Sequence, residues 1–289
     1  MNLIDGKSIA KQIQDHISKA ISHLTHRRPG LAFISIGDNP ASKTYVRMKK
    51  KKCAEVGMVS FDLDFSDAIS EQVLLQEIHQ LNLDPNVDGI LVQLPLPNHL
   101  STTRIMEAIL PEKDVDGFHP MNVGKMLIGD NDTFFPCTPH GILVLLTQAQ
   151  VPLLGKHVVI VGRSNIVGKP LAAILMQKAP HCNATVTVAN SFTEHLSEIC
   201  RSADVLVAAI GKPKFITANM VKKGAVVVDV GINRISDAKG RPLIVGDVDF
   251  ENVAPLCSQI TPVPGGVGPM TIAMLLSNTL LSYQRRIAY

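Results

Sequence analysis

The sequence predicts an α/β fold built from two domains, and three observations carry this prediction. The chain has 289 residues, which corresponds to about two domains of ordinary size. Short apolar runs of strand length alternate with segments of helical periodicity, as in parallel α/β units. After residue 135 the alternation starts again, so we expect a second α/β unit to begin close to residue 140.

The first half of the chain opens with a helix. Apolar residues recur at helical spacing over 6–25, directly behind Asp5, a candidate helix cap. The other elements predicted for this half are a strand at 31–36, a helix at 41–56, a strand at 59–63, a helix at 70–81 and a buried strand at 89–97 that its prolines end.

The second half repeats the pattern. We expect a linking helix at 136–150, a strand at 155–162, a helix at 168–178, a strand at 184–190, a helix at 195–203, strands at 204–211 and 225–233, a short strand within 258–269 and an apolar helix at 270–283. The predicted domains are therefore 1–139 and 140–269. The last segment, 270–289, is expected to pack back on the first domain.

Composition excludes several classes of protein. The net charge of +3 and the low aromatic content (4%) argue against a nucleic-acid-binding protein. The five scattered cysteines form no C-x-x-C pair, and the histidines form no H-x-x-x-H set, so we expect reduced thiols and no metal. The start of the chain lacks the apolar core of a signal peptide and no apolar run is long enough for a bilayer. We therefore expect a cytoplasmic protein that does not contact membranes.

A glycine turn follows the strand predicted at 155–162. Gly162, Arg163 and Ser164 lie between that strand and the next predicted helix, and a strand–turn–helix unit presents backbone N–H groups to a phosphate. The spacing differs from G-x-G-x-x-G, and a tight bend alone also uses glycine. A P-loop is excluded because five residues separate Gly162 from Gly168 and Pro170 replaces the Ser or Thr that binds magnesium. The turn therefore predicts a dinucleotide site.

The end of the following strand indicates which dinucleotide would bind. An acid at this place usually binds the ribose hydroxyls of NAD, but the chain reads Asn190-Ser191 here. Without that acid a 2′-phosphate is not repelled, and Ser191 and Arg163 can bind it. The sequence therefore favours NADP over NAD. An ordinary loop serine at position 191 is the alternative.

The first domain offers a second group of polar candidates. Ser42, Tyr45 and Lys49 share one face of a predicted helix, although a solvated basic face is the alternative for this lysine-rich segment. The order along the chain excludes a short-chain dehydrogenase reading of the Tyr-x-x-x-Lys pair. Gln93 ends a buried strand, where α/β proteins place ligand-binding side chains. Asp116 precedes a glycine, so an Asx turn is its alternative.

A glycine-rich loop completes the candidates. Pro264, Gly265 and Gly266 lie in a segment too rich in glycine for a core element. Such a loop would let a flat ligand approach the backbone closely.

Taken together, these segments resemble the bifunctional methylenetetrahydrofolate dehydrogenase/methenyltetrahydrofolate cyclohydrolase family over essentially the whole chain. The resemblance rests on PASKTYVRMK (40–49), GILVQLPLP (89–97), PEKDVDGFHPMNVG (111–124), PCTPHG (136–141), VVIVGRSNIVGKP (158–170), VVVDVGIN (226–233), GDVDF (246–250) and TPVPGGVGPMT (261–271). It implies two α/β domains flanking a cleft, the second a Rossmann-type NADP-binding domain, in a homodimer. It also implies a place in one-carbon metabolism, with its links to purine, histidine and methionine biosynthesis.

The resemblance implies two reactions and the residues that serve them. The family oxidises methylenetetrahydrofolate with NADP and hydrolyses the methenyl product to 10-formyltetrahydrofolate. By motif, Lys49 is the catalytic lysine, Gln93 is its hydrogen-bonding partner and Tyr45 packs against the folate. Asp116 binds the pterin. The implied contacts further include Ser42, Pro264, Gly265 and Gly266 for the substrate, and Gly162, Arg163, Ser164, Ser191 and Ile232 for the cofactor.

One position departs from the family pattern. Relatives often carry His-Ser-Arg or His-Ser-Lys after the second Rossmann strand, whereas this chain has Asn190-Ser191-Phe192. We therefore expect a weaker preference for NADP than in those relatives. A monofunctional dehydrogenase and a binding module without catalysis are the alternatives, and the presence of Lys49, Gln93 and Asp116 favours the bifunctional enzyme.

Overall fold

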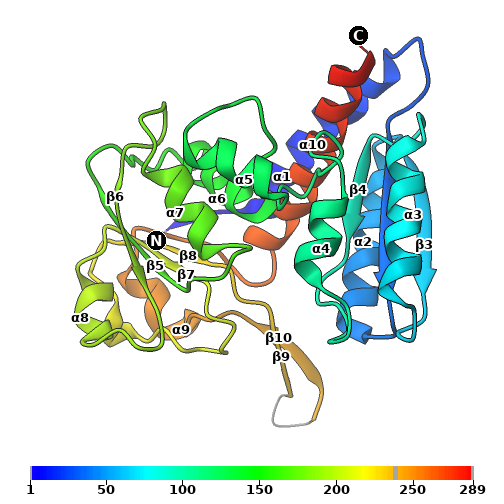
Figure 1. Ribbon diagram of the computed structural model, residues 1–289. Helices are drawn as coiled ribbons and strands as arrows, with labels where there is room; N and C mark the ends of the chain where they lie inside the picture. The colour runs from blue at the N-terminus through cyan, green and yellow to red at the C-terminus, as the bar shows by residue number, and fades with distance from the viewer. Residues whose placement is uncertain (1, 237–239, 288–289) are drawn as a thin grey trace. The chain divides into compact units, whose positions relative to one another are not determined.

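A computed structural model describes residues 2–236 and 240–287, and the side chains of 40–42 lie outside the described part. The chain forms two compact units, which we call unit 1 and unit 2 (Figure 1). Unit 1 comprises Met1–Ala10 and Thr138–Thr271, and unit 2 comprises Lys11–Cys137 and Ile272–Tyr289. Each unit has its own parallel sheet, so the predicted α/β class is confirmed.

Unit 2 contains a three-stranded parallel sheet in the order β3-β2-β4. Its strands are β2 (Gly30–Ile36), β3 (Val59–Phe65) and β4 (Gly89–Val92), joined through helices α2 (Pro40–Glu55) and α3 (Glu71–Leu83). This is the predicted alternation of strand and helix. The strand predicted at 89–97 ends at Val92, because the prolines that follow Gln93 cannot donate to a neighbouring strand.

One face of this sheet is covered by α3 and by α4 (Thr102–Ala108), which lie side by side in Figure 1. Alternate residues of β2, Ala32 and Ile34, point to this face and pack against Leu74 and Ile78 of α3. A continuous apolar strand is expected in a parallel sheet that is buried on both faces. The helices α4 and α5 (Pro120–Leu127) were not predicted, since each has only two turns of periodic pattern.

The C-terminal helix α10 (Val267–Ile287) belongs to unit 2 from Ile272 onward. Asn278 donates to the carbonyl oxygen of Val115 at 2.9 Å, and the Ser282 hydroxyl donates to that of Asp88 at 2.6 Å. Tyr283 is 2% exposed, and its hydroxyl donates to the carbonyl oxygen of Arg27 at 2.6 Å. Polar side chains in this apolar helix therefore tie it to loops of the first half of the chain.

The contact of Tyr283 gives a stability prediction. We expect Tyr283→Phe to lower the free energy of unfolding by about 1–2 kcal/mol, because a partly buried carbonyl loses its donor while the ring is kept. Urea denaturation of the two proteins measures the difference. An unchanged free energy of unfolding would show that the phenol contributes only its ring, which lies 5.1 Å from the Arg27 guanidinium.

Unit 1 contains a six-stranded sheet in the order β1-β11-β8-β7-β5-β6, with every neighbouring pair parallel. The strands are β1 (Asn2–Leu3), β5 (His157–Val161), β6 (Thr185–Ala189), β7 (Val205–Ala208), β8 (Val226–Asp229) and β11 (Gln259–Ile260). After β6 the chain returns to the other side of β5. Such a switch in strand order marks the ligand-binding edge of Rossmann-type sheets.

Helices connect these strands as the periodicity predicts. The predicted ones are α6 (Cys137–Gln148), α7 (Gly168–Leu175) and α8 (Leu196–Arg201), whereas the short α9 (Phe250–Val253) was not predicted. Helix α1 (Gly6–Ser22) begins in unit 1, and the Asp5 carboxylate accepts from Lys7 and Ser8 at its first turn, as the predicted cap requires.

Two parts of unit 1 differ from the predictions. Residues 2–3 form β1 and pair with β11, so the start of the chain joins unit 1 rather than the first predicted domain. The strand predicted at 225–233 ends at Asp229, and a hairpin of β9 (Asn233–Ser236) and β10 (Pro242–Val245) follows. A two-residue strand and a largely exposed hairpin carry no apolar run that a sequence pattern can detect.

Within the described residues, no helix has the length and apolar character to cross a membrane.

Candidate functional site

Helix α2 carries Tyr45 and Lys49 one turn apart, and Lys49 is only 5% exposed. The Lys49 Nζ lies 4.9 Å from the centre of the Tyr45 ring and donates to Gln93 Oε1 at 3.2 Å. The alternative of a solvated basic face is therefore wrong for Lys49, whereas the side chain of Lys51 is 74% exposed. Ser42 lies in the same helix, but its side chain is outside the described residues.

Gln93 is fixed at the end of β4. Its backbone N–H donates to the Ile34 carbonyl oxygen at 2.9 Å, which continues the sheet by one residue. Its side-chain Nε2 donates to the Leu94 carbonyl oxygen at 2.6 Å, so Oε1 is the atom left to face Lys49. The amide thus has one orientation, and it presents an acceptor to the lysine.

The surroundings of Lys49 change its acidity. Burial lowers the pKa of the Lys49 ammonium, and the negative charge of Asp116 opposes that shift. A lysine with a lowered pKa exchanges a proton more readily near neutral pH than one on the surface. The arrangement can therefore serve as a proton acceptor or donor.

The structure distinguishes the two aspartates of the KDVDGF segment. Asp114 is buried, and its carboxylate accepts from the backbone N–H groups of Gly117, Phe118 and His119. It thus holds the turn, and burial raises its pKa to about 7. Asp116 is half-buried. The Asx-turn alternative considered for Asp116 belongs to Asp114 instead.

Two residues that sequence reasoning missed support Asp116. Cys137 is fully buried; its N–H donates to the Asp116 carbonyl oxygen at 3.3 Å and its thiol to the Val115 carbonyl oxygen at 3.3 Å. Asn278 of α10 donates to the same Val115 oxygen. Burial raises the pKa of the Cys137 thiol well above its usual value, so this side chain stays neutral. The polar Asn278 within an apolar helix was the available signal.

The glycine turn lies between β5 and α7, where the sequence predicts it. Gly162 has φ of +136°, and a Cβ there would collide with the Ala209 carbonyl oxygen. The Ser164 hydroxyl accepts from the N–H of Val167 at 3.1 Å at the start of α7, while Arg163 and Ser164 are exposed. An exposed turn at a helix N-terminus suits a phosphate group.

The turn after β6 lies beside it. Ser191 and Phe192 are exposed in this turn, and the Arg163 guanidinium lies 5.7 Å from the centre of the Phe192 ring. Asn190 occupies the place where an acid would bind ribose hydroxyls. The absence of a negative charge at this position agrees with the prediction of NADP.

Two buried carboxylates that the sequence analysis did not assign connect the loops after β7 and β8. Asp229 accepts from the N–H groups of Gly231 and Val248, and Asp247 accepts from those of Ile210 and Gly211. Burial raises the pKa of Asp229 to about 6. The signal was an acid at the end of the apolar run 226–229. Ile232 follows in the same loop and is 57% exposed.

The loop of Pro264, Gly265 and Gly266 also belongs to unit 1. The Gly265 carbonyl oxygen accepts from the Lys7 N–H at 2.9 Å, and a Cβ on Gly6 would collide with the Gly266 carbonyl oxygen. The close backbone approach predicted for these glycines is thus made here to the start of α1. Contact with a ligand remains a prediction.

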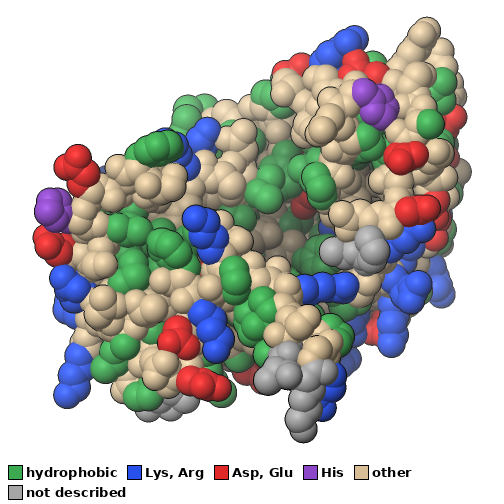
Figure 2. Space-filling view, turned by 90° about the horizontal axis from the view of Figure 1, so that it is seen from below, with side chains coloured by type: hydrophobic (Ala, Val, Ile, Leu, Met, Phe, Trp, Pro, Cys, Tyr) green, Lys and Arg blue, Asp and Glu red, His purple; other side chains and the backbone are tan. Residues whose placement is uncertain are grey.

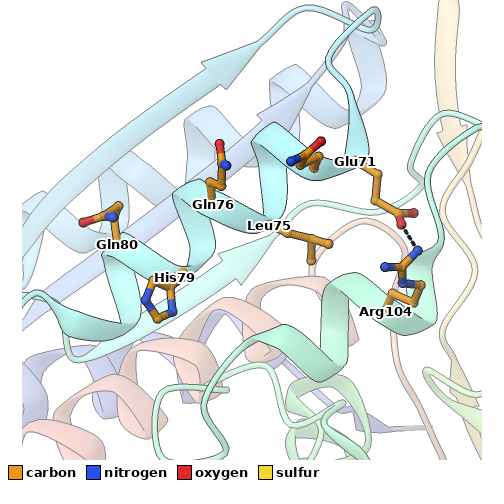
Figure 3. Close-up of a pocket in the computed structure, with 7 residues that line it drawn as sticks. Glu71, Leu75, Gln76, His79, Gln80 and Arg104 are labelled. Atoms are coloured by element: carbon orange, nitrogen blue, oxygen red, sulfur yellow. Dashed lines mark ion pairs between the residues drawn. The ribbon is translucent and has the colours of Figure 1, made fainter.

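The candidate residues therefore fall into two groups. Tyr45, Lys49, Gln93 and Asp116 belong to unit 2, and Gly162, Arg163, Ser164, Ser191 and Ile232 belong to unit 1 with the 264–266 loop. A separate hollow on α3 and α4 is lined by glutamines, His79 and the ion pair of Glu71 with Arg104 (Figure 3). It contains none of the predicted residues. Across the part of the chain that the structure describes, no three His, Cys, Asp or Glu side chains cluster as metal ligands.

Two family models match the chain. The model for the catalytic domain of tetrahydrofolate dehydrogenase/cyclohydrolase matches residues 4–116. The model for the NAD(P)-binding domain of the same enzymes matches residues 136–287.

Relatives and solved structures agree with these matches. The chain is 57% identical to bifunctional protein FolD of Protochlamydia amoebophila, over 98% of both chains. The crystal structure of the FolD dehydrogenase/cyclohydrolase from Campylobacter jejuni matches with a TM-score of 0.94 and 47% identity over 99% of each chain. That of the Trypanosoma brucei enzyme complexed with NADP and inhibitor matches with a TM-score of 0.93 and 37% identity, over 99% of this chain and 98% of that one.

Proposed function

This chain belongs to the tetrahydrofolate dehydrogenase/cyclohydrolase family, and from that membership we propose that it catalyses two successive reactions on one folate. It oxidises methylenetetrahydrofolate to methenyltetrahydrofolate with NADP, and it then hydrolyses the methenyl group to give 10-formyltetrahydrofolate and a proton. The single observation that carries this proposal is the buried Lys49, hydrogen-bonded to Gln93 and lowered in pKa.

Lys49 has the properties that the hydrolysis needs. In its neutral form it takes a proton from the water that attacks the methenyl carbon, and in its charged form it returns a proton to the departing nitrogen. Gln93 accepts from Nζ and so fixes the direction of the amine. Tyr45 lies under the same amine and offers its ring to the aromatic part of the folate. We propose Lys49 as catalytic and Gln93 as positioning.

Asp116 is proposed to bind the pterin. Its carboxylate is half-buried, and the neighbouring Asp114 already accepts from the N–H groups of the turn, so the turn does not depend on the Asp116 oxygens. A carboxylate accepts two parallel donors from an aminopyrimidinone edge. Ser42 and the 264–266 loop are proposed as further folate contacts on the family resemblance alone.

The residues of unit 1 fit NADP. The turn of Gly162, Arg163 and Ser164 is exposed at the N-terminus of α7, and Asn190 leaves the end of β6 without an acid. We propose that this turn binds the phosphates and that Arg163 and Ser191 bind the 2′-phosphate, with Ile232 contacting the cofactor. When bound, NADP supplies the acceptor for the hydride from the methylene carbon.

Arg163 gives the cofactor prediction. We expect Arg163→Ala to raise the KM for NADP about fivefold and to change that for NAD much less, because an exposed Arg–phosphate contact contributes about 1 kcal/mol. Measuring kcat/KM for both cofactors at one ionic strength decides this. A preference for NAD in the wild type, or equal losses with both cofactors, would contradict the assignment of Arg163.

The pKa of Lys49 gives a pH prediction. Cyclohydrolase activity should rise with pH as Lys49 loses its proton. The charge of Asp116 raises that pKa, so Asp116→Asn should move the rising limb to lower pH. The measurement is the pH profile of kcat for methenyltetrahydrofolate hydrolysis at saturating substrate, with spontaneous hydrolysis subtracted. If the rising limb of the Asp116→Asn profile lies at the same pH as in the wild type, the charge of Asp116 does not affect the titration of Lys49.

The test of the proposed function is turnover. The wild-type protein should reduce NADP with methylenetetrahydrofolate and should hydrolyse methenyltetrahydrofolate supplied on its own. Reduction of NADP without hydrolysis would establish the alternative, a monofunctional dehydrogenase. Binding of the folate and of NADP without either reaction would show that the protein is a binding module without catalysis.

We further propose a cytoplasmic homodimer that binds neither nucleic acid nor membranes. Figure 2 shows both basic and acidic side chains on the face in view, and the net charge of only +3 supports a protein without a strongly basic nucleic-acid-binding surface. Sedimentation at micromolar concentration, with and without duplex DNA, tests the dimer and the absence of DNA binding together.

A further inference from the structure

The side chains of Arg163 and Phe192 meet across two neighbouring turns of unit 1. Arg163 follows β5 and Phe192 follows β6, and these strands pair in parallel up to Val161 and Ala189. The Arg163 guanidinium lies 5.7 Å from the centre of the Phe192 ring, within the range of a cation–π interaction. Ser191 immediately precedes the ring in the same turn.

The turn that carries Phe192 is held by its own side chains. The Phe192 N–H donates to Asn190 Oδ1 at 3.0 Å, and the Asn190 N–H donates to the Thr193 hydroxyl at 2.8 Å. The Thr193 N–H donates back to the Asn190 carbonyl oxygen at 3.0 Å. Asn190 therefore shapes the turn from which the ring projects.

The turn that carries Arg163 is fixed as well. The Gly162 N–H donates to the Ala189 carbonyl oxygen at 2.9 Å, which ties this turn to the end of β6. Gly162 also packs closely against the backbone of Ala209. The two turns thus hold the backbones of Arg163 and Phe192 near each other, and both side chains project from a fixed backbone.

A ring contact orients an arginine without using its donors. A ring against the face of a guanidinium leaves the N–H groups at the edge of the plane available for an anion. An arginine that is already oriented loses less conformational freedom when it binds a phosphate.

We propose that Phe192 is a specificity-determining positioning residue, whose ring holds the Arg163 guanidinium beside Ser191 to receive the ribose 2′-phosphate of NADP. This rests on the proposed use of NADP. Phe192 itself carries no charge and need not touch the phosphate. In this chain a neutral ring thus contributes to selectivity through the guanidinium of Arg163.

The experiment measures binding of two probes by isothermal titration calorimetry at one ionic strength. Adenosine 2′,5′-bisphosphate carries the 2′-phosphate and 5′-AMP lacks it. The proteins are the wild type, Phe192→Leu, Phe192→Tyr, Arg163→Ala and the double variant Arg163→Ala/Phe192→Leu. Phe192 is 83% exposed, so its variants should keep the melting temperature of the wild type.

We expect Phe192→Leu to weaken binding of the bisphosphate about two- to fivefold and to leave binding of 5′-AMP unchanged. Phe192→Tyr keeps the ring and should bind like the wild type. In the Arg163→Ala background, Phe192→Leu should have no further effect, because the ring acts through the arginine.

Three results would overturn the proposal: unchanged or tighter bisphosphate binding by Phe192→Leu, equal losses for both probes, or a loss that persists without Arg163. A wild type that binds the bisphosphate no better than 5′-AMP would overturn both this proposal and the use of NADP. A wild type that prefers the bisphosphate, with a preference of the same size in Phe192→Leu, overturns the proposal for Phe192 alone.

Discussion

Replacing Lys49 with methionine or alanine is expected to reduce cyclohydrolase activity by at least about a hundredfold, the usual contribution of a positioned proton-transfer group. The dehydrogenase activity should fall less, because hydride transfer does not need a proton acceptor. The measurement is the rate of methenyltetrahydrofolate hydrolysis beside the rate of NADP reduction. If either variant hydrolyses methenyltetrahydrofolate at the wild-type rate, Lys49 is not a catalytic residue.

The fold should survive these changes, for a reason that the structure supplies. Lys49 is buried rather than on the surface, and burial lowers its pKa. The buried ammonium therefore destabilises the folded state. Methionine fills a similar volume without the charge, and the melting temperature should be unchanged or higher. Lys51→Met, at an exposed position of the same helix, is the matched control and should leave both activities unchanged.

Asp116→Ala is expected to weaken folate binding by about 2–5 kcal/mol, or about thirty- to four-thousandfold, since buried donors of the pterin lose a charged acceptor. The affinity for NADP should be nearly unchanged. Calorimetric titration with a folate and with NADP measures both values.

Asp114→Ala is the matched comparison for this prediction. Asp114 accepts from three backbone N–H groups and from Asn122, so its loss should lower the melting temperature. If Asp116→Ala instead lowers the melting temperature and binds folate normally, then Asp116 is a structural residue and the assignment is wrong.

Much of the fold follows from local pattern. The runs that became β2, β5 and β7 are apolar, short and ended by polar or glycine residues, so buried strands were the expected result. Helical periodicity located α1, α2 and α3 within a few residues of their bounds. The pairing of β1 with β11 could not be predicted in this way, because a two-residue strand is defined only by its distant partner.

The candidate site could be predicted only in part, because local pattern does not specify contacts between residues that are distant in the sequence. Helical spacing indicated that Tyr45 and Lys49 share a face, but burial of Lys49 depends on Gln93 and the end of β4, which lie far away in the sequence. Likewise, the choice between Asp114 and Asp116 depends on which carboxylate reaches the N–H groups of the turn. Spacing alone does not contain that information.

The time course of a single reaction mixture tests the central claim most directly, that one chain oxidises the folate and then hydrolyses it with Lys49. Methylenetetrahydrofolate and NADP are mixed with the enzyme, and NADPH, methenyltetrahydrofolate and 10-formyltetrahydrofolate are followed together. The wild type should form 10-formyltetrahydrofolate in step with NADPH, whereas Lys49→Met should accumulate the methenyl compound. Accumulation of methenyltetrahydrofolate in equal amount to NADPH by the wild type would contradict the claim.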